Sequence, residues 1–136
     1  MSYQNKAGQY RAMNRHGLVA AATPERLIQI SLEGILTHLA TARGCMLRIH
    51  GNLPLADVVT KGEAIGKAVR LIGHLNDSLD MGRGGEVAAN LRNLYLYMLD
   101  RLTEANLTNN PQRVAEVADL LRQIKGGWDQ LVAARQ

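Results

Sequence analysis

The sequence is poor in the features that cross-link a chain or carry it into a membrane. Cys45 is the only cysteine among 136 residues, so no intramolecular disulfide can form, which fits a reducing compartment. Charged residues interrupt every apolar stretch before it reaches the roughly 20 residues that span a bilayer. Residues 1–17 also lack the apolar stretch of a secretory signal. We therefore expect a cytoplasmic protein without membrane insertion.

Residues 1–22 contain no acidic residue, although they carry Lys6, Arg11 and Arg15. The formal net charge of the whole chain is +4, so the remainder is nearly neutral. A basic-armed helical protein that associates with nucleic acid is therefore one alternative, because basic side chains neutralise phosphates. Three charges offer little, however, and a nucleic-acid binder of this size more often shows a basic stripe along a folded face.

The sequence also lacks the spacings of catalytic and metal sites. Its four histidines have no histidine or cysteine partner at metal-ligand spacing, and neither has Cys45. The glycines around Arg83 lack the preceding strand and the Gly-Lys-Ser/Thr ending of a phosphate loop. A bundle that senses a small molecule is a remote alternative, since no convergent polar set would orient a ligand. We expect no catalytic residue, no metal and no cofactor, and we predict that the protein is not an enzyme.

Four long segments instead repeat apolar residues at steps of three and four, which predicts helices with one buried seam each. No run alternates in the manner of a β-strand. The four seams run over residues 28–49, 55–79, 88–105 and 114–131. Helices of this length joined by short connections favour an all-α fold, an antiparallel up-down-up-down four-helix bundle over residues 23–136. Residues 1–22 are too polar for a core of their own, and we interpret them as a mobile N-terminal arm.

Capping and turn residues separate the predicted helices. Thr23-Pro24 is an N-cap followed by proline at the first helical position, and Asn109-Asn110-Pro111 repeats that signal before the last segment. Gly51–Pro54 and the glycine-rich turn at 82–85 mark the other two connections, with Glu86 predicted to begin the third helix. Three glycines weaken the second segment, since each costs a helix roughly 0.5 to 1 kcal/mol relative to alanine unless it allows close packing.

One stretch is too apolar for a single seam. Residues 94–99 read Leu-Tyr-Leu-Tyr-Met-Leu, and on a helix they point in every direction around the axis. One interpretation is that Leu96 and Tyr97 are ordinary scattered surface residues while the other four fill the core. The other is that they edge an exposed apolar groove for a partner, flanked by residues such as Val59, Ala118 or Leu120, and that the tyrosine-bearing arm covers this groove when it is empty.

These residues resemble a bacterial family, the flagellin-specific export chaperones of the FliS type. The resemblance covers nearly the whole chain, from Tyr10 to Trp128, including Thr23-Pro24, Leu27 and Glu33-Gly34. Its most specific block is Ser78-Leu79-Asp80-Met81, Gly84-Gly85-Glu86-Val87-Ala88, Asn90-Leu91, Leu94-Tyr95, Tyr97-Met98, Arg101-Leu102 and Ala105-Asn106. The chain departs from the pattern in its small apolar residues 16–22 and in Gly62, Gly66 and Gly73 of the second segment.

The resemblance implies a helical bundle that binds the disordered C-terminal segment of flagellin in the cytosol. Holding that segment would prevent premature polymerisation and keep flagellin competent for type III export through the flagellar export apparatus. A client that folds on binding could wrap such a bundle. An empty groove could also pair with a second copy, so a weak homodimer is a further candidate.

We predict Leu96 and Tyr97 as groove residues and Asn90 and Arg101 as polar contacts to the client. For the two polar residues a structural reading stays open, with Asn90 inside the bundle and Arg101 paired with a nearby acid. Two residues of the arm, Tyr10 and Met13, are predicted to cover the groove in competition with the client.

Overall fold

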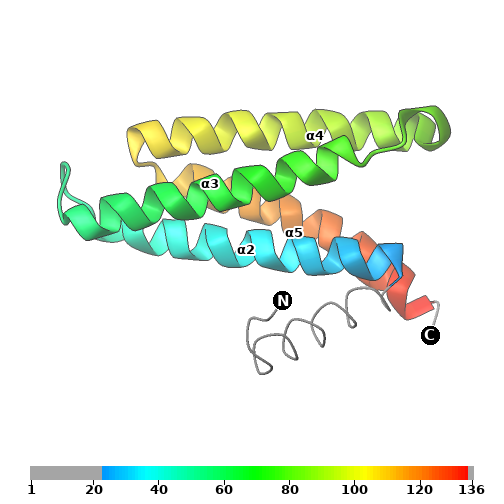
Figure 1. The fold of residues 1–136 in the computed structure, drawn as a ribbon, viewed down its shortest axis with the longest axis horizontal. Coiled ribbons are helices and arrows are strands. Elements are labelled where there is room, and N and C mark those ends of the chain that lie inside the picture. The colour runs from blue at the N-terminus through cyan, green and yellow to red at the C-terminus, as the bar shows by residue number, and fades with distance from the viewer. Residues whose placement is uncertain (1–22, 135–136) are drawn as a thin grey trace, which may run out of the picture.

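A computed structural model describes residues 23–134 as four helices in an antiparallel bundle (Figure 1). They are α2 (Pro24–Arg48), α3 (Leu55–Asp77), α4 (Met81–Thr108) and α5 (Pro111–Ala134). Within this range the only β pairing is an isolated bridge between His50 and Leu53 in the α2–α3 connection. The predicted all-α up-down-up-down bundle is confirmed. The predicted arm, with Tyr10 and Met13, lies outside the described residues.

The predicted caps begin two of the helices. The Thr23 hydroxyl accepts a hydrogen bond from the backbone N–H of Arg26 at 3.1 Å, with Pro24 in the first turn of α2. Before α5, the Asn110 side-chain oxygen accepts from the backbone N–H groups of Gln112 and Arg113 at 3.1 and 3.2 Å. Each cap satisfies backbone donors that have no partner inside the helix, so both helices begin at their prolines.

The beginning of α4 differs from the prediction. Asp80 accepts from the backbone N–H of Arg83 at 3.0 Å and caps a first turn that begins at Met81, one turn before Glu86. That turn ends at Gly85, whose φ of 55° and ψ of −130° break the helix before it resumes. The continuous part of α4 therefore begins at Glu86, as predicted, but the glycine-rich segment before it is a helical turn capped by Asp80 and not a plain turn.

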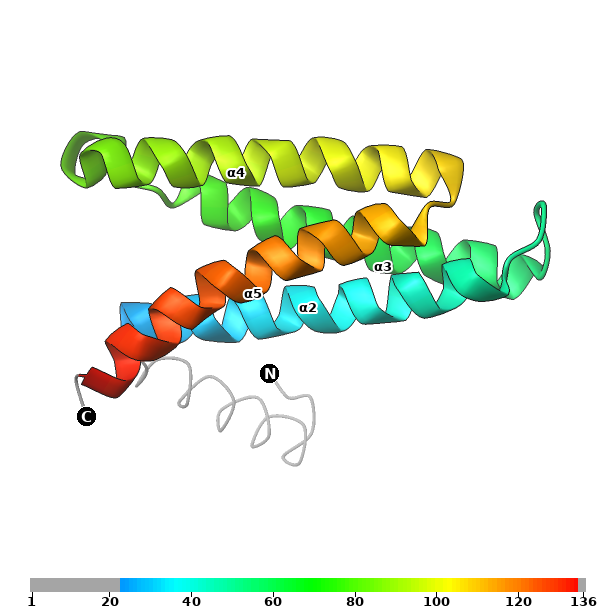
Figure 2. The ribbon, with the colours of Figure 1, turned by 180° about the vertical axis from the view of Figure 1, so that it is seen from behind.

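The helices form a ring in which α2 packs against α3 and α5, and α4 packs against the same two helices from the opposite corner. The α4–α5 interface is the smallest of the four. In Figure 2, α5 begins beside the end of α4 and then runs obliquely away from it toward the beginning of α2. The two helices therefore diverge toward the end of the bundle that holds the α3–α4 turn.

The predicted seams form the core over most of the bundle. Leu32 and Ile35 of α2, Ile72 of α3 and Met98 and Leu102 of α4 are completely buried. On α5, however, burial follows the seam only as far as Leu121, since Ile124 and Trp128 are half-buried and Leu131 is 37% exposed. The repeat of apolar residues thus continues past the point where α5 has a second helix to cover it.

The opposite end of the bundle is closed by polar contacts. The Lys61 ammonium group on α3 is buried and donates to the backbone carbonyl of Asn106 at 3.0 Å and to the side-chain oxygen of Asn109 at 3.5 Å. A cation there also interacts favourably with the C-terminal end of α4. Asn109, left-handed at φ 50°, donates its side-chain amide to the carbonyl of Met46 on α2 at 3.2 Å. These contacts tie α2, α3 and α4 together.

Two glycine substitutions should have opposite effects on stability. Gly85→Ala places a side chain at a positive φ, and we expect it to lower the free energy of unfolding by about 1–3 kcal/mol. Gly73→Ala adds a methyl group that meets no atom within 4 Å inside α3, and should raise that free energy by about 0.5–1 kcal/mol. Urea denaturation of both variants measures the difference. A stabilising Gly85→Ala would contradict the backbone geometry described here.

Lys61→Met should destabilise the closed end. The methionine retains most of the buried side chain but leaves the Asn106 carbonyl without its donor, which we expect to cost about 1–3 kcal/mol in the free energy of unfolding. Lys67→Met on the exposed face of the same helix is the matched control and should stay within about 0.5 kcal/mol of the wild type. Equal denaturation midpoints for the two variants would show that the buried ammonium group does not stabilise this end.

Candidate binding groove

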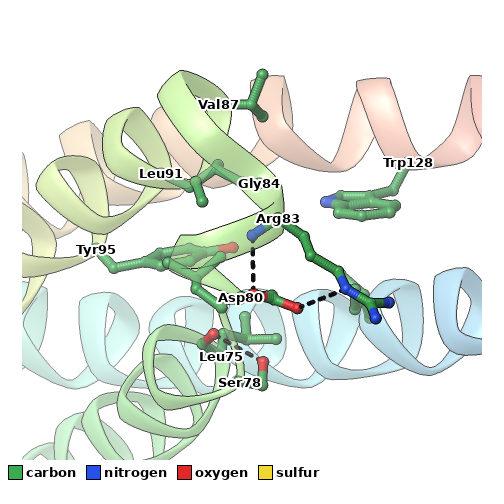
Figure 3. Close-up of a pocket in the computed structure, with 12 residues that line it drawn as sticks. Leu75, Ser78, Asp80, Arg83, Gly84, Val87, Leu91, Tyr95 and Trp128 are labelled. Carbon is green, nitrogen blue, oxygen red and sulfur yellow. Dashed lines mark hydrogen bonds and ion pairs between the residues drawn. The ribbon is translucent and has the colours of Figure 1, made fainter.

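An apolar groove lies where α4 and α5 diverge. It consists of two hollows of about 370 and 380 Å³ that share Val87 and Leu91 of α4 and Trp128 of α5. The first reaches inward to Ile28, Leu75 and Tyr95, and the second continues along α5 past Ile124 to Leu131. In Figure 3, Val87 and Leu91 stand on α4 on one side while the Trp128 ring faces them from α5. We call this surface the α4–α5 groove.

The groove exists because apolar residues, some in the seams and some beside them, continue along α4 and α5 where these helices no longer cover each other. Leu91 is spaced four residues from Val87, and Leu131 follows Ile124 by seven, the spacing that places residues on one helical face. Closer to the α4–α5 turn the same faces are buried between the helices. Here they are not, so Val87 is 68% exposed. A contiguous apolar patch of this kind in a monomer usually marks a site that binds another molecule.

The α3–α4 turn forms one end of the groove. Asp80 and Arg83, both exposed, lie there with their side chains 3.9 Å apart. Gly84 lines the same wall, and a Cβ added to it would lie 2.5 Å from the Cβ of Ala88, so a side chain would displace the wall. Tyr95 lies beneath, and burial raises the pKa of its phenol, so the hydroxyl is neutral near pH 7. Polar groups thus collect at one end of an otherwise apolar surface.

The residues predicted for the site lie elsewhere on α4. Leu96 and Tyr97 are 40% and 38% exposed, and Asn90 is exposed rather than inside the bundle. None of these three, nor Arg101, lines the α4–α5 groove. The structure therefore brings none of the four into this surface, and their contact with a client stays a prediction.

Tyr97 and Arg101 lie together in a polar network between α4 and α5. The Tyr97 hydroxyl donates to Glu116, and Arg101 donates to that hydroxyl at 2.9 Å with its guanidinium 5.1 Å from the ring centroid. Arg101 also pairs with Glu104 at 3.0 Å and with Glu116 at 3.6 Å. The hydrogen bonds to Tyr97 and Glu104 raise the pKa of the Arg101 guanidinium above its ordinary value. The structure therefore bears out the ion-pair reading for Arg101.

The groove residues were missed because the sequence pattern assigned them to the core. Leu91, Ile124, Trp128 and Leu131 all stand at seam positions, and nothing in the repeat distinguishes a covered seam from an open one. Val87 lies outside the seam and is apolar, which is the one local signal that this end of α4 is not an ordinary solvent face.

Among the described residues, the one cysteine is not set up as a nucleophile. Burial raises the pKa of the Cys45 thiol, and the neighbouring Asp57 carboxylate raises it further, so little of the reactive thiolate is present. Across residues 23–134 no three side chains of histidine, cysteine, aspartate or glutamate cluster closely enough to hold a metal ion. None of the four helices combines the length and apolarity needed to cross a bilayer. What the molecule offers is an apolar surface.

Fold and groove together define a class, the antiparallel four-helix bundles with an exposed apolar groove between two of their helices. The particular family follows from comparison with known proteins. The model of the flagellar protein FliS family matches residues 5–135, and the chain belongs to this family. The resemblance drawn from the sequence is thereby confirmed.

Three similar proteins are each named a flagellar secretion chaperone. The chain is 45% identical over 121 residues to the flagellar secretion chaperone FliSB of Pseudomonas aeruginosa, covering 89% of this chain and 90% of that protein. It is 38% identical to the flagellar secretion chaperone FliS of Salmonella typhimurium, covering 90% and 86% of the two chains. The corresponding protein of Vibrio cholerae is 34% identical, with 90% and 85% covered.

Proposed function

We propose that this protein is a flagellar secretion chaperone that binds the disordered C-terminal segment of flagellin in the cytosol. Binding prevents premature polymerisation and keeps flagellin competent for type III export through the flagellar export apparatus. The observation that carries this proposal is the open α4–α5 groove in a chain of the FliS family. The groove acts by binding alone, so the proposed function is not enzymatic.

The groove suits a segment that becomes helical on binding. Its apolar lining follows two diverging helices. The apolar face of an amphipathic helix can therefore lie between α4 and α5 and cover the residues that these two helices leave exposed. A disordered client loses conformational entropy when it folds, which lowers affinity for a given buried area. That balance favours a complex that holds flagellin and still releases it at the export apparatus.

The predicted residues outside the groove extend this proposal along α4. A client longer than the groove would pass Asn90 and reach the exposed Leu96 and Tyr97, and the Tyr97 ring lies beside the charged Arg101. Tyr10 and Met13 of the proposed arm would occupy the groove when no client is bound. A second copy of the chain is the competing occupant, as a weak homodimer.

Co-purification tests the function most directly. We expect full-length flagellin to form a complex with this protein and flagellin without its C-terminal segment to form none. Size-exclusion chromatography of the protein without flagellin measures whether it self-associates. Equal complex formation by both flagellins would place the contact elsewhere in the client and refute the proposed mechanism.

Val87→Asp should weaken binding of a flagellin C-terminal peptide by about tenfold or more, because it puts a charge that the client must desolvate into the groove. Leu107→Asp is the matched control, since Leu107 is also an exposed apolar residue of α4 but lies outside the groove. It should bind like the wild type. Isothermal titration of the three proteins with one peptide measures the effect, and equal affinities would remove the groove from the binding site.

Tyr97→Asp tests the extended contact. It replaces the ring with a carboxylate next to Glu116, and we expect about fivefold weaker binding of the same peptide if the client reaches this part of α4. Tyr97→Phe keeps the ring and serves as the control, with an affinity close to that of the wild type. An unchanged affinity for Tyr97→Asp would confine the client to the α4–α5 groove.

A further inference from the structure

The C-terminal half of α5 is held against α2 by buried and half-buried polar side chains. Gln29 of α2 is only 7% exposed, and its amide donates to the Asp129 carboxylate of α5 at 2.5 Å. Arg26 donates in turn to the side-chain oxygen of Gln29 at 3.0 Å. The nitrogen and the oxygen of the buried Gln29 amide thus each have a partner, and the partner of the nitrogen lies on α5.

Ion pairs extend this contact into a network. Lys125 lies one turn before Asp129 on α5 and pairs with it at 2.9 Å. Lys125 also reaches Glu33 of α2 at 3.8 Å, and Glu33 lies 3.5 Å from Arg26. The hydrogen bonds from Lys125 and Gln29 lower the pKa of the Asp129 carboxyl, so the network holds it in its charged form. We call Arg26, Gln29, Glu33, Lys125 and Asp129 the α2–α5 clamp.

The α4–α5 groove includes Trp128, the residue directly before Asp129 on α5. Trp128 precedes Asp129, and adjacent helical residues point about 100° apart, so the clamp binds α2 while Trp128 faces α4 across the groove. This half of α5 therefore has two competing neighbours. It can lie on α2, where the clamp forms, or on α4, where Ile124 and Trp128 would cover Leu91.

The second arrangement would bury apolar surface of α4 and α5 that is now exposed. Closing α5 onto α4 would remove from water the groove surfaces of Val87, Leu91, Trp128 and Leu131, and such burial stabilises roughly in proportion to the apolar area. The clamp opposes it through directional contacts. If α5 left α2, Gln29 would lose its hydrogen bond to the Asp129 carboxylate, and Lys125 would lose its contact with Glu33.

We infer that the α2–α5 clamp is the positioning device of the binding groove: it holds α5 on α2, keeps the α4–α5 groove open and exposes Trp128 to a client. None of the five clamp residues lines the groove. They act through the position of α5, so their loss closes the groove without removing any of its surface. The effect on client binding rests on the proposed function, whereas the position of α5 does not.

Trp128 is the only tryptophan in the chain and reports on the groove without a client. In Asp129→Ala we expect the emission maximum of the free protein to move to shorter wavelength and acrylamide quenching to fall, because α5 closes and buries the indole ring. Affinity for the flagellin C-terminal peptide should fall about fivefold or more. Asp119→Ala is the matched control, since Asp119 also lies on α5 but pairs at 2.8 Å with Arg122 of its own helix. It should change neither measurement.

The fluorescence result decides the inference even if the peptide does not bind. An unchanged or red-shifted emission in Asp129→Ala, with helical content retained by circular dichroism, would overturn it. If that variant does not fold, Asp129→Asn decides by the same criteria, since it keeps an acceptor for Gln29 but removes the charge that pairs with Lys125. A blue shift with no peptide binding by the wild type would support the clamp and refute the proposed function.

Discussion

The α5 helix can pack closely against two neighbours at its beginning but against only one at its end. Near the α4–α5 turn it contacts both α2 and α4, and the seam residues Val114, Val117 and Leu121 are buried between them. Beyond Leu121 it follows α2 and leaves α4. The α4–α5 groove follows from this divergence, because it leaves two apolar helical faces without a cover.

The two ends of the bundle use polar groups for different purposes. At the closed end, Lys61 and Asn109 satisfy backbone carbonyls of α4 and α2 and tie three helices together. At the open end, Gln29 and Asp129 join only α2 and α5. Buried polar contacts select one arrangement among several of similar apolar burial, since an alternative packing leaves their donors and acceptors without partners.

This arrangement fits the demands on a secretion chaperone of the FliS family. A protein that binds a folding-competent segment needs apolar surface that stays accessible, yet such surface tends to close on itself or on a second copy. The inferred α2–α5 clamp holds α5 away from α4 from the opposite side, so none of its own charges lies in the groove. The polar Asp80 and Arg83 at the α3–α4 turn then mark one end of an apolar site.

The helices and most of the core could be predicted from the sequence, because seam spacing and capping residues are local signals. Thr23-Pro24 and Asn110-Pro111 predicted where α2 and α5 begin, and Leu32, Met98 and Leu102 are buried as their positions indicated. The continuous part of α4 begins at Glu86 as predicted, but the helical turn from Met81 was missed, because an aspartate cap outweighed glycines whose local preference is for a turn.

The groove could not be predicted in this way. The sequence by itself determined which side chains face inward on each helix, since that depends on a period of 3.6 residues within one element. Whether a neighbouring helix covers Trp128 and Leu131 depends on the angle between α4 and α5, and contacts between residues about 100 positions apart, such as Gln29 with Asp129, set it. Only the tertiary structure therefore decided where the core ends and the exposed apolar groove begins.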